Sequence, residues 1–96
     1  MNSILQSTKE CFFCHRPDGL HCHHIFGGAN RKWSEAYGLK VWLCAPHHNM
    51  SDAGVHFNKA MDIQLKQIAQ RAFEDQYGRD KFMQVFGKNY LPNIEG

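Results

Sequence analysis

Two pairs of potential metal ligands constrain this chain more than any other feature. Cys11 and Cys14 form a C-x-x-C motif, and Cys44 and His47 form a C-x-x-H motif. A two-residue spacing lets a tight turn direct both side chains at one tetrahedral ion, as in structural zinc sites. A chain of 96 residues has a small core, so such a metal would add folding energy directly. We expect these four residues to bind a structural Zn²⁺ that has no open position for chemistry.

The cysteines are open to a second interpretation, as buried free thiols beside a surface histidine. The first ten residues lack the apolar run and basic leader of a signal peptide, and no segment approaches the ~18 apolar residues of a membrane helix. We therefore expect a cytoplasmic protein without membrane contact, where thiols stay reduced and paired cysteines favour metal binding.

The net charge of +2 is compatible with nucleic-acid binding but does not require it.

The chain divides into two parts of different composition. Residues 1–57 hold every cysteine and histidine, whereas residues 58–91 have the composition of helices. No linker separates the two parts. We expect one domain over residues 1–96, with a zinc-braced core in 11–58 and a helical extension in 59–91.

The local patterns predict an α+β fold. Residues 20–26 and 39–44 are expected to form two short antiparallel strands, with a short helix at 34–37 closed by Gly38. Asn58 can cap a helix over 59–77, whose apolar stripe comprises Met61, Leu65, Ile68, Ala69, Ala72 and Phe73. A second helix over 80–86 would add Phe82, Val85 and Phe86 to the same core.

Further histidines cluster between the two ligand pairs. His23 and His24 are adjacent on an expected strand, so their side chains should point to opposite faces. One of them could then bind a metal while the other faces a substrate. The alternative is a second structural zinc, formed by Cys22 with one of this pair and with His15 or His21.

The stretch "LHCHHIFGG", the strand "LKVWLC" and the following "APHH" resemble the HNH motif of the ββα-metal (His-Me finger) endonucleases. The likeness is strongest to small zinc-braced phage members, similar to phage recombination-enhancement nucleases, and covers about residues 11–58. It implies a ββα-metal core with a short antiparallel hairpin, zinc knuckles and a C-terminal helical extension. It also implies a metal-dependent DNA endonuclease, encoded by a phage or prophage, that hydrolyses phosphodiester bonds in DNA processing or recombination.

The resemblance assigns roles to individual histidines. His23 and His48 would bind a catalytic Mg²⁺ or Mn²⁺, and His24 would act as general base. A neutral imidazole can take a proton from water at cellular pH, and a divalent ion can relieve charge on the scissile phosphate.

The sequence departs from the family pattern at two positions. The family often has another histidine four residues after the one matched by His48, where this chain has Asp52. We expect His56 to be the last ligand of the catalytic metal, with Asp52 and Asn58 as alternatives. The middle asparagine of the motif is expected at Asn30, which would orient the general base.

DNA binding is expected at the cationic segment that contains Arg31, Lys32 and Lys40 around Trp33. Alternatively, Trp33 packs on the zinc knuckle. A recombinase or another DNA-processing protein of phage or host is an expected partner, and double-strand cutting would need a homodimer or two successive events.

Two other functions compete with the nuclease. One is a non-catalytic zinc-finger adaptor that binds nucleic acid or a host protein. The other is a phage protein whose helical tail binds a host protein, and an exposed apolar patch on Phe82, Phe86 and Tyr90 would favour it.

Overall fold

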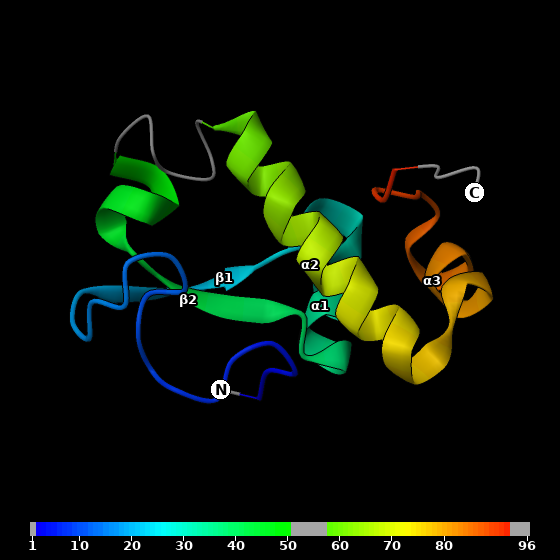
Figure 1. The fold of residues 1–96 in the computed structure, drawn as a ribbon, viewed down its shortest axis with the longest axis horizontal. Helices are drawn as coiled ribbons and strands as arrows, with labels where there is room; N and C mark the ends of the chain where they lie inside the picture. Colours follow the sequence, from blue (N-terminus) through cyan, green and yellow to red (C-terminus); the bar gives the residue numbers. More distant parts are fainter. Residues whose placement is uncertain (1, 51–57, 93–96) are drawn as a thin grey trace.

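The computed structural model describes residues 2–50 and 58–92 and has a small mixed α+β fold. A two-stranded antiparallel hairpin is followed by C-terminal helices (Figure 1), which confirms the expected fold class at this level. In chain order the elements are β1 (Leu20–His24), the short helical turn η1 (Gly28–Asn30), α1 (Arg31–Tyr37), β2 (Lys40–Cys44), the helical turn η2 (Pro46–Met50), α2 (Lys59–Tyr77) and α3 (Arg79–Phe86).

The two strands pair with Leu20 opposite Cys44 and His24 opposite Lys40. Strand β1 ends at His24, two residues earlier than expected, because the chain then turns into the core. There the amide of Phe26 donates to the Ser34 hydroxyl at 2.9 Å. The N-terminal segment contacts β2, because the Phe12 amide donates to the Trp42 carbonyl at 2.8 Å. This contact with β2 holds the segment that carries Cys11 and Cys14 close to Cys44, the last residue of β2.

Helix α1 begins three residues earlier than expected and ends at Gly38, whose left-handed conformation (φ 69°) lets its amide donate to the Ser34 carbonyl. A Cβ atom at this position would lie 3.1 Å from the Asn2 carbonyl oxygen and 3.2 Å from the Ile4 nitrogen. Glycine is thus required both by the backbone angle and by the close approach of the N-terminal segment.

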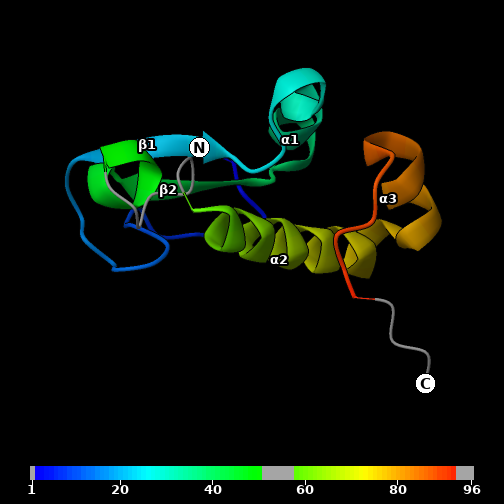
Figure 2. The same ribbon diagram turned by 90° about the horizontal axis from the view of Figure 1, so that it is seen from above.

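Helix α2 runs along one side of the hairpin, and α1 lies on the other side (Figure 2). Asn58 caps α2 as expected, since its side-chain oxygen accepts from the Met61 amide at 3.1 Å. Of the expected apolar stripe, Leu65, Ala69 and Phe73 are fully buried. Its other members, Met61, Ile68 and Ala72, are only partly buried. None of the helices in the described residues is long and apolar enough to cross a membrane.

Helix α3 closes an aromatic core. The Phe86 ring lies 4.5 Å from that of Phe26, and the Phe82 ring lies 5.6 Å from that of Phe73. Phe82 and Phe86 are both buried, and Tyr90 packs on Phe26 with its ring 5.4 Å away. An exposed apolar patch on these residues would have favoured a partner-binding tail. Instead, Phe82 and Phe86 belong to the core, and Tyr90 is partly buried against it.

Candidate metal centre and adjacent histidine cavity

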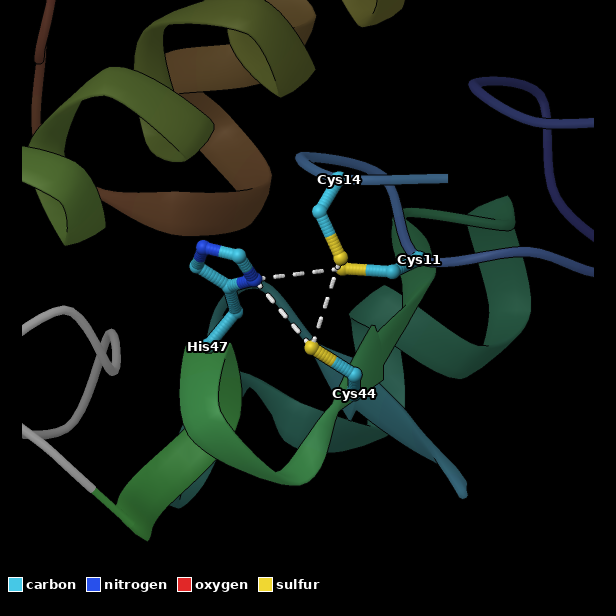
Figure 3. A group of neighbouring side chains, drawn as sticks. All are labelled: Cys11, Cys14, Cys44 and His47. Atoms are coloured by element: carbon cyan, nitrogen blue, oxygen red, sulfur yellow. Dashed lines mark hydrogen bonds between the residues drawn. The ribbon is translucent and has the colours of Figure 1, made fainter. Parts of the chain in front are cut away.

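The four predicted zinc ligands lie together (Figure 3). Their ligand atoms are all within 4.8 Å of one another. Two of the separations, Cys11 Sγ to His47 Nδ1 and Cys14 Sγ to Cys44 Sγ, are 3.6 Å, and Cys44 Sγ lies 3.1 Å from His47 Nδ1. A tetrahedral zinc with thiolates at ~2.3 Å places sulfur atoms about 3.8 Å apart. The expected grouping is confirmed, and the cluster could hold a metal ion such as zinc.

Local backbone geometry forms the first half of this cluster. The Cys11 amide donates to the Arg16 carbonyl at 2.9 Å, and the His15 amide donates to the Cys11 carbonyl at 2.8 Å. His15 completes the turn in the left-handed region, at φ 65°. Its ring nitrogen lies 2.5 Å from the Glu10 carboxylate, outside the metal cluster.

The second half is formed where β2 ends. Cys44 is the last residue of the strand, and His47 follows in η2, where its ring lies 5.5 Å from that of Phe13. Burial acts to raise the pKa of the Cys11 thiol, but hydrogen bonds from the backbone of Cys44, Cys14 and Phe13 outweigh it and bring the pKa to about 6. Burial raises the pKa of Cys44. A bound cation would favour the thiolate form of these ligands.

A separate cavity of about 240 Å³ opens beside the hairpin, and it is lined by Cys22, His23, His24, Gly27, Arg31 and His48. The ring of His23 meets that of His48 edge to face at 5.4 Å, and the ring of His21 stacks on His48 at 5.3 Å. His23 is only 7% exposed. The structure thus brings the three histidines expected at a catalytic centre, His23, His24 and His48, to one cavity.

Glu35 contacts His24, and sequence reasoning missed it. The Nε2 atom of His24 lies 2.6 Å from one oxygen of the Glu35 carboxylate, and the Lys40 amine lies 2.7 Å from the other oxygen. Two hydrogen bonds, the larger effect coming from Lys40 and the smaller from His24, lower the pKa of Glu35 to about 2. One feature of the sequence could have indicated this contact. Lys40 lies in the most apolar strand, and a buried ammonium requires an acidic partner.

Asn30 does not take the position expected for the middle asparagine of the motif. Its side-chain amide is directed at the carbonyl of Phe86 in α3, at 3.4 Å. Asn30 lies at the end of η1, just before α1, so its side chain reaches the C-terminal helices, whereas Glu35 from α1 reaches the hairpin. The residue bonded to His24 is therefore Glu35.

Lys40 also differs from its expected role. It is buried at 5% exposure and its amine is bound to Glu35, so it does not offer a surface charge to DNA. Arg31 and Lys32 are exposed, and both line a neighbouring cavity of about 390 Å³ together with His24 and Glu35. Trp33 packs against the core.

Other candidate ligands fall outside this arrangement. Asp52 and His56 lie outside the described residues, and the side-chain oxygen of Asn58 serves as the cap of α2. Within residues 2–50 and 58–92, the only group of three or more potential ligands is the zinc-type cluster described above. The alternative zinc cage around Cys22 is therefore not formed by these residues.

Neither protein-family models, nor curated proteins, nor solved structures gave a match to this chain.

Proposed function

We propose that this protein is a metal-dependent DNA endonuclease of the HNH type, with a structural zinc at Cys11, Cys14, Cys44 and His47. The observation that carries the proposal is the cavity in which His23, His24 and His48 meet beside Arg31. It combines a candidate base, candidate metal ligands and a phosphate-binding cation, which are the groups that phosphodiester hydrolysis needs.

His24 is the proposed general base. Its Nε2 atom faces the Glu35 carboxylate, which can only accept a hydrogen bond, so a neutral His24 carries its proton on Nε2. This leaves the lone pair on Nδ1 to take a proton from water. The water oxygen then forms a bond to phosphorus, and the bond from phosphorus to the 3′ oxygen breaks.

His23 and His48 would hold the catalytic metal. Both line the cavity, and their rings meet edge to face with centroids 5.4 Å apart. Two imidazoles leave most positions on such an ion open, and Mn²⁺ or Mg²⁺ would fill them with oxygen atoms from water and from the phosphate, the ligands that these ions prefer. Such an ion supplies Lewis-acid stabilisation of the charge that develops on the phosphate.

Arg31 and Lys32 are the proposed phosphate contacts. Both are exposed in the first turn of α1 and line a cavity that includes His24. Backbone contacts of this kind act on any sequence and weaken as salt rises. One active site handles one strand, so the expected products are nicks unless a homodimer forms or a recombinase presents the DNA.

The test is cleavage of supercoiled plasmid and of single-stranded DNA with Mn²⁺, with Mg²⁺ and with neither ion. The expected result is metal-dependent nicking that falls steeply in His23→Ala and His48→Ala proteins, with one zinc per chain in every sample. The second candidate function is a non-catalytic zinc-finger adaptor, and it is favoured by the position of Asn30, whose side chain contacts Phe86 and not His24. Zinc-loaded wild type that binds DNA without cutting it would support this adaptor.

A further inference from the structure

One carboxylate joins two side chains that lie opposite each other on the hairpin. His24 of β1 pairs directly with Lys40 of β2, and residues paired in this way carry their side chains on the same face of the sheet. Glu35 of α1 reaches both of them, with Oε2 at 2.6 Å from His24 Nε2 and Oε1 at 2.7 Å from Lys40 Nζ.

The burial of the three side chains differs. The side chains of Lys40 and His24 are 7% and 13% exposed, whereas that of Glu35 is 59% exposed. An exposed glutamate normally samples several rotamers. Here Glu35 cannot move away without leaving the buried ammonium of Lys40 unpaired, and an unpaired buried charge strongly destabilises a fold. The burial of Lys40 thereby fixes the carboxylate against His24.

We propose that Glu35 is a positioning residue for the general base His24, and that Lys40 acts through Glu35 to hold it in place. The inference rests on the nuclease function proposed above. Glu35 fills the role expected for Asn30, because it accepts the proton on Nε2 and so orients the ring with Nδ1 available for water. A carboxylate also stabilises the imidazolium that forms when His24 takes the proton, which a neutral amide does less well.

The test compares zinc-loaded wild type with Glu35→Ala, Glu35→Gln and Lys40→Met proteins. Glu10→Gln is the matched control, because Glu10 also binds a histidine, His15, but lies outside the histidine cavity. The first readout is the Nε2–H resonance of His24 in ¹⁵N-labelled protein, which a hydrogen bond protects from exchange with water. The second is the single-turnover cleavage rate constant, measured beside the Kd for DNA.

We expect the resonance to be lost in Glu35→Ala and weakened in Lys40→Met, and to persist in Glu10→Gln. The cleavage rate constant should fall about 10- to 100-fold in Glu35→Ala, the usual range for the loss of a side chain that orients an active-site histidine, with little change in Kd. Glu35→Gln, which keeps an acceptor, should lie between Glu35→Ala and wild type.

A resonance that persists in Glu35→Ala would overturn the proposal, and so would a cleavage rate constant equal to that of the wild type. If the wild type does not cut DNA at all, the proposed function fails. The resonance still decides separately whether Glu35 holds His24.

Discussion

The zinc cluster can be tested with a matched pair of cysteine substitutions. Cys14 and Cys22 are both exposed, but only Cys14 belongs to the four-ligand cluster. The cluster joins segments 30 residues apart, from Cys14 to Cys44. Treated as a cross-link that closes a loop of this length, it removes about 3.6 kcal/mol of chain entropy from the unfolded state. That is a large share of the roughly 5–15 kcal/mol that stabilises a domain.

We therefore expect Cys14→Ser to lower the free energy of unfolding by about 3 to 4 kcal/mol, and Cys22→Ser by less than about 0.5 kcal/mol. For a domain of this size the melting temperature should fall by about 15 to 30 °C in the first protein only. The assay is urea unfolding followed by circular dichroism, with zinc content measured on each sample. The reasoning would be refuted if the two variants had equal free energies of unfolding. It would also be refuted if a strong chelator left the free energy of unfolding of the wild type unchanged.

Three other substitutions probe the fold and its charges. Phe73→Ala should cost about 3 to 5 kcal/mol in urea unfolding, because Phe73 is fully buried among aromatic rings. Gly38→Ala should cost at least about 1 kcal/mol in the same assay, since φ is 69° and a Cβ would press on the Asn2 carbonyl. Glu35, whose pKa is lowered from 4.5 to about 2, should stabilise the fold fully above pH 4.5 and lose this effect as the pH falls toward 2. Melting curves of wild type and Glu35→Gln should therefore converge over that range, and a constant gap would contradict the assignment.

The features that the sequence predicted well are local ones. The ligand spacing of Cys11 with Cys14 depends on a single turn, and the cap at Asn58 depends on the next three residues. The apolar stripe of α2 follows from helical periodicity, so the burial of Phe73 could be predicted as well.

The contacts that the sequence did not predict depend on how elements meet in space. Glu35 reaches His24 because α1 packs beside the hairpin end, and the same carboxylate contacts the buried Lys40. Gln70 lies in the core because its side chain binds the backbone amide of Tyr90 at 2.8 Å, in the segment after α3. Periodicity marks such a polar residue as exposed, since it carries no information on a distant backbone partner.

The central claim, that His24 activates water for phosphodiester hydrolysis, is tested most directly by one cleavage comparison. Zinc-loaded wild type, His24→Ala and His15→Asn proteins are incubated with supercoiled plasmid and Mn²⁺ under single-turnover conditions. His15 is an exposed histidine beside the zinc cluster, and asparagine tolerates its left-handed backbone. We predict nicking by wild type and His15→Asn, and a rate constant about 10²- to 10⁴-fold lower in His24→Ala. Equal cutting by His24→Ala, or no cutting by the zinc-loaded wild type, would contradict the claim.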